Sequence, residues 1–341
     1  MKTIAMCALL AALAFGLLPG NRDEAAAPDE GLVLLVETQQ DAQAPQKASS
    51  ARQNQSEKAA VQTAPDAQTV RLLDGGAVTA LSMEDYLTGV LLSEMPADFE
   101  PEARKAQAVA ARTFTCRKLL QPKHKNADVC ADFSCCQAWT SREQLRQKYG
   151  ASFDTVWSAA REAVRQTAGE VLTYDGQLID AVYFSCSGGA TEAAVAVWGT
   201  DVPYLQAVES PGEEAAPRFS SRAVFSPEEF SQRLMQENPD VQLSGSPDTW
   251  LGETTRSAGG GAATCSIGGV SFSGTQLRRM FGLNSTRLTL SYQDGDFVFD
   301  VTGFGHRVGM SQYGAQTMAR LGFSYQTILQ YYYQGAEVER Q

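Results

Sequence analysis

The chain has 341 residues, of which 28 are Lys or Arg and 39 are Asp or Glu, so its formal net charge is −11. With 43% hydrophobic residues, this composition is ordinary for a globular protein and excludes a collagen-like, a fully disordered or a multi-span membrane chain. The acidic excess argues against a nucleic-acid partner, because neutralising phosphates needs clustered Lys and Arg. Seven cysteines are too few for a disulfide-framed mini-domain, and the only two histidines are His124 and His306.

The first part of the chain predicts an export segment followed by a tether. In residues 1–20, Lys2 precedes a nearly unbroken apolar run, which is typical of a signal-type segment. Because a bilayer span needs about 20 apolar residues, a cleaved signal peptide and an uncleaved anchor both remain open. Residues 21–67 are rich in Ala, Gln and acidic side chains and predict a flexible acidic tether. We therefore expect a working domain over residues 68–341 that acts outside the cytoplasm.

The working domain mixes short strands with helices. Val70–Leu73 and Ala77–Ala80 predict a hairpin around the turn residues Asp74, Gly75 and Gly76. Hydrophobic periodicity predicts further elements in chain order. They are helices over 82–95, 101–120, 141–150 and 152–167, strands over Val171–Tyr174, Leu178–Phe184, Leu288–Tyr292 and Phe297–Thr302, and helices over 311–321 and 324–333.

The order of these elements predicts the fold class. Segregated blocks favour an α+β fold, with mixed helices and short antiparallel strands, over a repeating βαβ sheet. We expect two subdomains that form a substrate cleft. The glycine-rich stretch 254–264 is interpreted as a flexible connection, since no Lys-Ser/Thr follows that would make it a phosphate-binding loop.

Two charged residues on predicted helices are candidates for chemistry. Periodicity from Leu87 places Glu94 on the core-facing side of the helix over 82–95, where burial would raise the pKa of its carboxyl as a general acid requires. A glutamate facing solvent at the helix end is the alternative, and periodicity alone favours it. The alanine-rich helix over 101–120 permits close packing against another helix, which would make Arg112 an inward cation for a carboxylate or a substrate oxygen. A surface arginine is the alternative, and the residue by itself favours it.

A third group of residues has the composition of a metal site. His124, Cys130, Cys135 and Cys136 bring one imidazole and three thiols into 13 residues, and these are soft ligands that tetrahedral zinc accepts. The alternative is a disulfide such as Cys130 with Cys136, which an exported protein favours. Zinc is preferred because one of the two histidines lies inside the cluster, and a closed ligand set predicts a structural role.

Two glycine-containing stretches complete the candidates. Tyr183–Gly189 ends a predicted strand with small hydroxyls and glycines, which suits a loop that approaches a ligand closely. Cys186 within it is interpreted as a packed thiol, since no histidine lies near it in sequence. Gly303–Ala315 places His306 just before a helix start capped by Ser311, and a structural imidazole is the alternative to a functional one.

Taken together, these segments resemble the stage II sporulation protein D family, whose domain is shared with amidase-enhancer proteins. The resemblance extends from about residue 83 to residue 337. Its motifs are Leu92-Ser93-Glu94-Met95-Pro96, Lys105 through Thr113, Ser187-Gly188-Gly189 with Thr191-Glu192, Val197-Trp198-Gly199 before Val202-Pro203-Tyr204-Leu205, and Val308 through Ala315.

The resemblance implies a peptidoglycan lytic transglycosylase that cleaves the MurNAc–GlcNAc β-1,4 bond and leaves a 1,6-anhydro-MurNAc end. Glu94 falls on the family's catalytic acid and Arg112 on its active-site arginine. One carboxylate suffices because the sugar's own C6 hydroxyl attacks the anomeric carbon, whereas ordinary glycosidases need two. Binding or supporting roles follow for Lys105, Gln107, Tyr183, Ser185, Ser187, Gly188, Gln312 and Tyr313.

The resemblance also implies a setting. It implies action during engulfment in sporulation, on glycan strands stripped of stem peptides, with the stage II amidase (protein P) and the membrane protein M as partners. The chain would be held by a single anchor in the mother-cell membrane, or secreted if the segment is cleaved. A non-catalytic peptidoglycan-binding enhancer of a partner amidase is the alternative function.

This chain departs from the family pattern at three positions. The family's zinc cluster reads His-x5-Cys-x4-His-Cys, so Cys135 stands where the second histidine would be. Cys186 interrupts the Ser-Thr-Ser-Gly-Gly-like run, and Arg307 follows His306 where glycine is usual.

Overall fold

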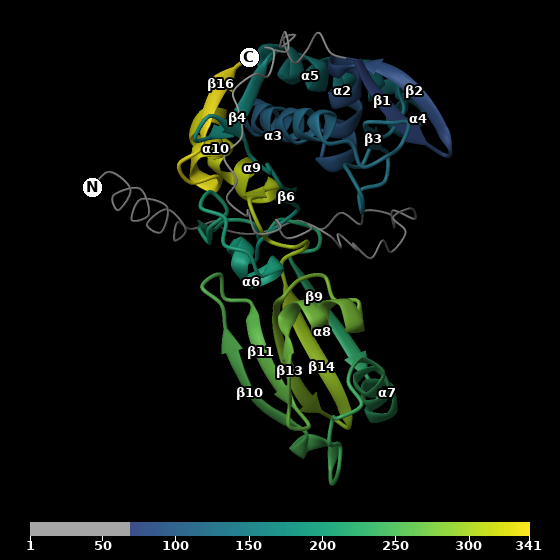
Figure 1. The fold of residues 1–341 in the computed structure, drawn as a ribbon, viewed down its shortest axis with the longest axis vertical. Helices are drawn as coiled ribbons and strands as arrows, with labels where there is room; N and C mark the ends of the chain where they lie inside the picture. The colour runs from purple at the N-terminus through teal and green to yellow at the C-terminus, as the bar shows by residue number, and fades with distance from the viewer. Residues whose placement is uncertain (1–68) are drawn as a thin grey trace, which may run out of the picture.

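The computed structural model describes residues 69–341. The predicted signal-type segment (1–20) and acidic tether (21–67) lie outside the described residues. Within residues 69–341, no helix is both long enough and apolar enough to cross a membrane. The fold is α+β, as predicted, with helices among several small, mostly antiparallel sheets. Two hydrophobic cores define an upper and a lower lobe, named as they lie in Figure 1.

The upper lobe is organised around the long helix α3 (Pro101–Leu120). Helices α2 (Met83–Glu94), α5 (Phe153–Gln166), α9 (Gln312–Arg320) and α10 (Tyr325–Tyr332) all pack against it. The close approach predicted from the alanine content of α3 is confirmed, since small side chains let helix backbones come near one another. The buried alanines of α3 are Ala103, Ala106, Ala108, Ala110 and Ala111.

Two small sheets border the upper lobe. The predicted N-terminal hairpin forms as β1 (Thr69–Asp74) and β2 (Ala77–Ser82), and β3 (Val129–Cys130) pairs in parallel with β1. In the other sheet, β4 (Glu170–Tyr174) pairs with the C-terminal strand β16 (Glu337–Arg340). The sheet is completed by β5 (Gln177–Leu178), and α4 (Arg142–Tyr149) precedes α5.

The continuous strand predicted over Leu178–Phe184 is wrong. The chain leaves the β4–β5 hairpin after Leu178 and pairs again only at β6 (Tyr183–Phe184), which lies parallel to β15 (Met310–Ser311). The apolar residues between are buried against the upper core without a strand partner, so an apolar run here reflects burial and not pairing.

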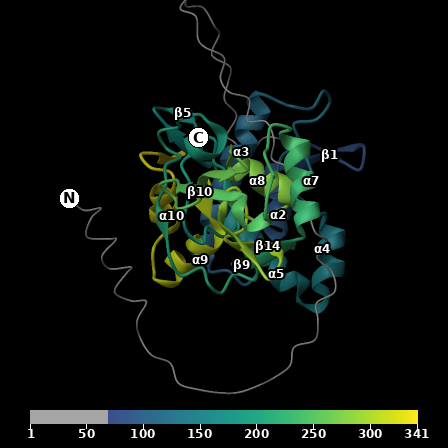
Figure 2. The ribbon, with the colours of Figure 1, turned by 90° about the horizontal axis from the view of Figure 1, so that it is seen from below.

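The lower lobe contains a three-stranded antiparallel sheet in the order β13 (Arg287–Gln293), β14 (Asp296–Thr302), β9 (Ser220–Phe225). Helices α7 (Pro227–Glu237) and α8 (Gly274–Phe281) contribute to the core on one face of this sheet. Stacked aromatic rings dominate that core, namely Phe225, Phe230, Phe281, Phe297 and Phe299. Figure 2 looks along the long axis, with the lower lobe in front of the upper one.

The flexible connection predicted over residues 254–264 is also wrong. The chain forms a hairpin there, with β10 (Leu251–Arg256) paired to β11 (Ala262–Ile267) and β12 (Val270–Ser273) beyond it. The glycines form the tight turn between the strands, where the N–H of Ser257 donates to Gly261 O at 2.9 Å. Threonine and alanine on both sides supply the strands, so the glycine run marks a turn.

Short elements at the waist join the two lobes. The chain passes through β7 (Gly189–Ala190), α6 (Ala194–Trp198) and β8 (Glu209–Ser210) before it enters β9, and it returns to the upper lobe after β14. Figure 1 shows the returning segment running beside β6 on its way to α9. Segments that are more than a hundred residues apart in sequence therefore meet at the waist.

Candidate active site

Glu94 is the last residue of α2, and the helix places it on the wall of a pocket. Ser82 caps the start of α2 by accepting from the N–H of Asp85, and the extended backbone at Met95 ends the helix before Pro96. The Glu94 side chain is half-buried, and its Oε1 accepts a hydrogen bond from the N–H of Ala138 at 2.6 Å. One oxygen of the carboxyl group is thus held by the main chain.

The pocket has a volume of about 360 Å³ and lies at the upper side of the waist. The predicted residues Glu94, Tyr183, Ser185, Gln312 and Tyr313 line it together. Residues that were not predicted to bind or support the substrate complete the lining, and several of them belong to the motifs or to the cysteine cluster named above. They are Ser93, Pro96, Phe114, Phe133, Cys136, Gln137, Ala138, Val182, Phe184, Pro217, Arg218 and Phe304.

The pairing of β6 with β15 brings the two glycine-containing motifs together. Met310 lies opposite Tyr183, and the N–H of Tyr313 donates to Ser185 O at 3.0 Å. Ser311 then caps α9, as predicted, by accepting from the N–H of Gly314. The first two residues of α9 consequently enter the pocket beside the end of β6.

Tyr183 is a neutral hydrogen-bond donor in this pocket. Burial raises its pKa well above the ordinary value, and the nearby negative charge of Glu94 raises it further. The Tyr183 hydroxyl donates to Gln137 Oε1 at 2.8 Å, while Gln137 Nε2 donates to the hydroxyls of Tyr86 and Thr115 at 3.3 and 3.1 Å. Gln137 precedes the residue that holds Glu94, so this network orients the same segment.

Five predicted supporting residues lie outside the pocket lining, and three of them are on α3. Gln107 is fully buried and accepts from Gln312 Nε2 at 3.4 Å, so it lies behind the lining. Lys105 pairs with Glu102 at 2.7 Å. Arg112 is fully buried, so the predicted inward orientation is confirmed, and it donates to the carbonyls of Val164 and Glu170 at 2.9 and 3.3 Å. These bonds tie α3 to the region between α5 and β4.

Ser187 and Gly188 contact a buried carboxylate. The Oε2 atom of Glu213 accepts from the N–H and hydroxyl of Ser187 at 2.5 and 2.8 Å and from the N–H of Gly188 at 3.0 Å. Its other oxygen accepts from the hydroxyls of Ser210 and Ser311 at 2.6 and 2.5 Å. Such a set of donors compensates the cost of burying a carboxylate. Glu213 thereby joins the Ser187 loop to the start of α9, and no sequence pattern marked it.

Arg307, one of the departures from the family pattern, links the lobes through a fully buried guanidinium. It donates to the carbonyls of Ser187 and Gly259 at 2.7 Å each and pairs with Glu192 at 3.1 Å. Burial is the main cause that lowers the pKa of Arg307 to about 10. The negative charge of Glu192 acts in the opposite direction and raises this pKa. The Arg307 backbone φ of 67° lies in the left-handed region, which glycine adopts most readily. The many bonds of the side chain stabilise that backbone.

His306 and Cys186 are packed groups in this structure. Burial lowers the pKa of His306 to about 3, so the imidazole is neutral near pH 7, and its Nδ1 accepts from the N–H of Val308 at 3.1 Å. Its ring lies between those of Phe184 and Trp198. Burial, and then the charge of Glu213, raise the pKa of Cys186 to about 12, which keeps the thiol protonated. The packed interpretation of Cys186 is confirmed.

The four predicted metal-ligating residues converge beside the pocket. Their ligand atoms all lie within 4.8 Å of one another, and the three cysteines are free thiols. His124 Nε2 lies 3.6 Å from Cys135 Sγ and 3.7 Å from Cys136 Sγ. Tetrahedral zinc with ordinary bond lengths would set nitrogen about 3.6 Å from each sulfur, so this donor set fits zinc. Cys135 therefore fits as a ligand despite the sequence departure.

A turn at Asp132 brings the cysteines together. The N–H groups of Cys135 and Cys136 donate to Asp132 O at 3.1 and 2.8 Å, while Cys130 is held in β3. The same loop continues directly into Gln137 and Ala138, so the cluster and the wall that holds Glu94 belong to one segment.

Comparison with known proteins shows the family of the chain. A family model described as "Stage II sporulation protein" matches residues 74–174, which include α2, α3 and the cysteine cluster. The chain is 36% identical over 300 residues to "Stage II sporulation protein D" of Bacillus subtilis (strain 168), covering 83% of this chain and 85% of that protein. It is 38% identical over 264 residues to the protein of the same name from Bacillus amyloliquefaciens, covering 76% and 75%. The chain belongs to the stage II sporulation protein D family.

A more distant relative has a different name. The "Amidase enhancer" of Bacillus subtilis (strain 168) is 30% identical over 301 residues, covering 73% of this chain and 39% of the longer relative. The domain thus occurs in proteins of two different descriptions, both related to this chain over most of its length.

Proposed function

We propose that the chain is a sporulation lytic transglycosylase that cleaves MurNAc–GlcNAc β-1,4 bonds in peptidoglycan and leaves 1,6-anhydro-MurNAc ends. The observation that carries this proposal is that Glu94 is the sole Asp or Glu among the described residues lining its pocket. Glycosidases that use water or a covalent intermediate need a second carboxylate near the scissile bond. A pocket with a single carboxylate suits a reaction in which the substrate supplies its own nucleophile.

The proposed reaction needs one proton carrier. The Glu94 carboxyl protonates the glycosidic oxygen as the bond from that oxygen to C1 of MurNAc breaks. The C6 hydroxyl oxygen then bonds to C1, and its proton passes to the Glu94 carboxylate, which regenerates the acid. Atoms balance without water. The bond from Ala138 N–H fixes the orientation of the Glu94 carboxyl on the wall of the pocket.

The remaining lining residues suit a sugar. Tyr313, Phe133 and Phe304 offer apolar ring surfaces, while Ser185, Gln312 and Ser93 offer hydrogen-bonding groups. Such a mixture of aromatic walls and a few polar groups is typical of sites for small polar ligands. Arg112 supports the site through α3, because its bonds hold this helix to the end of α5 and the start of β4.

We further propose that His124, Cys130, Cys135 and Cys136 hold a structural zinc ion. When bound, the ion would close the loop over 124–136 without an open coordination position for substrate. Support comes from the spacing of the four ligand atoms. The residues of this loop then present Ala138 to Glu94, which is the contribution of the cluster to the proposed reaction.

The proposed setting follows from family membership and the predicted export segment. We propose that the protein acts outside the cytoplasm during engulfment, tethered to the mother-cell membrane or secreted. Its substrates are strands stripped of stem peptides, and its partners are the stage II amidase (protein P) and the membrane protein M. The amidase-enhancer relative supports a second candidate, in which the domain binds peptidoglycan without cleaving it.

Mass spectrometry of peptide-free glycan strands decides between these functions. The wild-type chain should release products ending in 1,6-anhydro-MurNAc, and Glu94→Gln should release none because the amide cannot donate the proton. Glu143→Gln is the matched control, since Glu143 is exposed on α4 and outside the pocket. Absence of anhydro products with wild type, or equal activity of Glu94→Gln, would overturn the catalytic proposal and favour the enhancer.

A further inference from the structure

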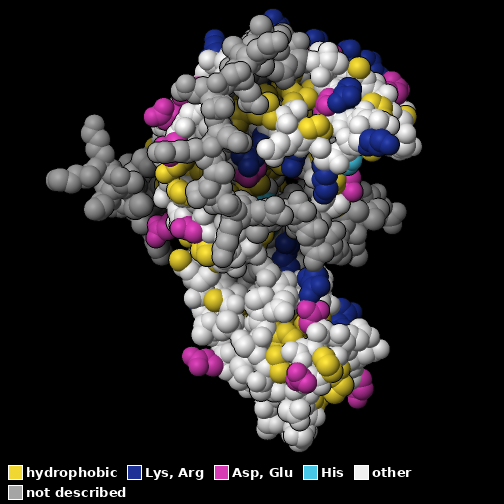
Figure 3. All heavy atoms as spheres, viewed as in Figure 1, with side chains coloured by type: hydrophobic (Ala, Val, Ile, Leu, Met, Phe, Trp, Pro, Cys, Tyr) yellow, Lys and Arg dark blue, Asp and Glu magenta, His cyan; other side chains and the backbone are white. Residues whose placement is uncertain are grey.

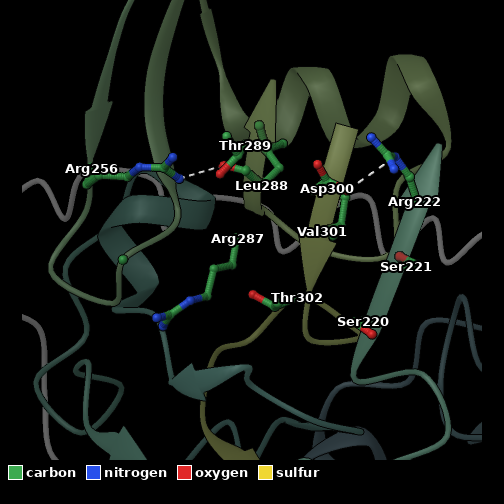
Figure 4. A pocket seen from close by; sticks show the side chains of 11 residues that line it. Ser220, Ser221, Arg222, Arg256, Arg287, Leu288, Thr289, Asp300, Val301 and Thr302 are labelled. Atoms are coloured by element: carbon green, nitrogen blue, oxygen red, sulfur yellow. Dashed lines mark hydrogen bonds and ion pairs between the residues drawn. The ribbon is translucent and has the colours of Figure 1, made fainter. Parts of the chain in front are cut away.

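A second pocket, of about 700 Å³, lies on the lower lobe (Figure 4). Its floor is the open face of the sheet β13–β14–β9, opposite the face that packs against the aromatic core. The cross-strand register places Arg287, Thr302 and Ser220 in one row and Thr289, Asp300 and Arg222 in the next. Side chains of alternating residues share a face, so all six project on this side.

The pocket carries an excess of positive charge. Three arginines and one aspartate line it, a net charge of +2. Arg222 pairs with Asp300 at 3.4 Å, and Arg256 donates to Leu288 O at 2.6 Å. The half-buried side chain of Arg287 makes no hydrogen bond or ion pair within residues 69–341, and Figure 4 shows it extending toward the lower left of the view, away from Thr302. Its five N–H donors are available to a ligand.

Arg287 lies against glycine backbones, and no anion in the described part of the chain pairs with it. A Cβ atom added at Gly189 or Gly260 would lie 3.5 or 3.3 Å from its Nη1, so the guanidinium lies against these two glycines. The charge of Arg287 lowers the pKa of the buried Arg307, which shows that the two cations repel each other. A cation kept in this position without a partner is typical of a site for an anion.

The arginine pocket is adjacent to the Glu94 pocket along two chain segments. Pro217, Arg218 and Phe304 line the Glu94 pocket, whereas Ser220 and Thr302 line the arginine pocket. Between them, the N–H of Gly303 donates to Phe219 O at 2.7 Å. Three residues of extended chain span at most about 10 Å, so a polymer in one pocket can reach the other. Figure 3 shows Lys and Arg side chains gathered along this waist.

We propose that the arginine pocket binds a lactyl carboxylate of muramic acid on the same glycan strand that enters the Glu94 pocket. This inference rests on the proposed function, since it takes the substrate class from it. Arginine forms paired hydrogen bonds to a carboxylate, and Ser220, Thr289 and Thr302 offer hydroxyls to a sugar. A stem peptide converts the lactyl carboxylate into an amide and removes its charge. The pocket therefore selects peptide-stripped strands.

Binding is measured with the full chain carrying Glu94→Gln, which separates recognition from cleavage. The probes are peptide-free MurNAc–GlcNAc oligomers, the same oligomers with their carboxylates reduced to alcohols, and a glycerol-phosphate oligomer. Adding Arg287→Gln should weaken binding of the carboxylate oligomer by about tenfold or more, because a charged hydrogen-bonded pair is lost. Binding of the reduced oligomer should stay unchanged. Arg165→Gln on α5 removes an exposed arginine elsewhere and is the matched control.

Three outcomes would overturn the proposal. Equal affinity for the carboxylate and reduced oligomers would show that the pocket does not bind the carboxylate. Unchanged affinity for the carboxylate oligomer after Arg287→Gln would show the same. Tighter binding of glycerol phosphate than of the glycan would assign the pocket to a phosphate polymer instead. Because Arg287 has no protein partner among the described residues, Arg287→Gln should leave the unfolding temperature unchanged or raised. Cleavage by the chain with native Glu94 is measured separately, so loss of the proposed reaction would not be mistaken for loss of this site.

Discussion

Glu94 at the end of α2 accepts its 2.6 Å hydrogen bond from Ala138, a residue 44 positions away on the segment that leaves the cysteine cluster. The proposed acid and the proposed metal site are therefore mechanically linked. Ala138 directly follows Gln137, which is held by its hydrogen bonds, and Gln137 directly follows the cysteine cluster. The orientation of Glu94 depends on both, and the predictions below test each of them.

Tyr183 and Gln137 should be energetically coupled. Tyr183→Phe leaves Gln137 Oε1 without its 2.8 Å donor, so the free energy of unfolding should fall by about 1–2 kcal/mol. Gln137→Leu should cost a similar amount, and the double variant should cost less than the sum of the two. Urea denaturation of all four proteins gives the coupling energy. Strict additivity would mean that the hydrogen bond does not stabilise this segment.

Removing zinc should lower both stability and turnover. We expect the wild-type chain to contain about one zinc ion per molecule, and Cys135→Ser to lose most of it with a fall in unfolding temperature. Cys265→Ser, at a buried thiol of the lower lobe, is the control and should retain the metal. Metal analysis, thermal unfolding and product release are measured in parallel. Wild-type protein without metal, or full activity of zinc-free Cys135→Ser, would contradict the proposed role.

His306 should make the folded state sensitive to acid. Its pKa is about 3 in the folded protein and near 6.5 in an unfolded chain, so below pH 6.5 the unfolded state binds the extra proton. Its contribution to stability is thus complete above pH 6.5 and is lost as the pH falls toward 3, at up to about 1.4 kcal/mol per pH unit. Urea unfolding at pH 7 and pH 5 should show a smaller difference for His306→Gln than for wild type. Equal differences would show that His306 titrates normally.

The buried pair between Arg307 and Glu192 should be important for the junction of the lobes. Arg307→Leu leaves the Glu192 carboxylate buried without its cation, and we expect a loss of about 3–5 kcal/mol of unfolding free energy. The partly exposed pair of Arg161 with Glu84 is the control, and Arg161→Leu should cost at most about 1 kcal/mol. Chemical denaturation measures both variants. A similar small loss in the two would mean that the buried pair adds little to the native state.

Local patterns in the sequence determined most of the upper lobe. The cap at Ser82, the apolar period and Pro96 define α2 and place Glu94 at its end, and the alanines of α3 define a close-packing helix. The spacing of His124, Cys130, Cys135 and Cys136 predicts their convergence, because all four lie within a short loop. These features depend on neighbours within a few residues, which a sequence displays directly.

Only the tertiary structure decided which distant groups meet. Ala138 donates a hydrogen bond to Glu94, and Glu213 accepts hydrogen bonds from both Ser187 and Ser311 at the start of α9. Arg287 lies on the open face of the lower sheet. The turn at residues 257–261 and the break between Leu178 and Tyr183 likewise depend on strand partners elsewhere in the chain. Hydrogen bonds between residues far apart in the sequence leave no periodic pattern in it. The residues that complete this pocket can therefore be identified only in the folded chain.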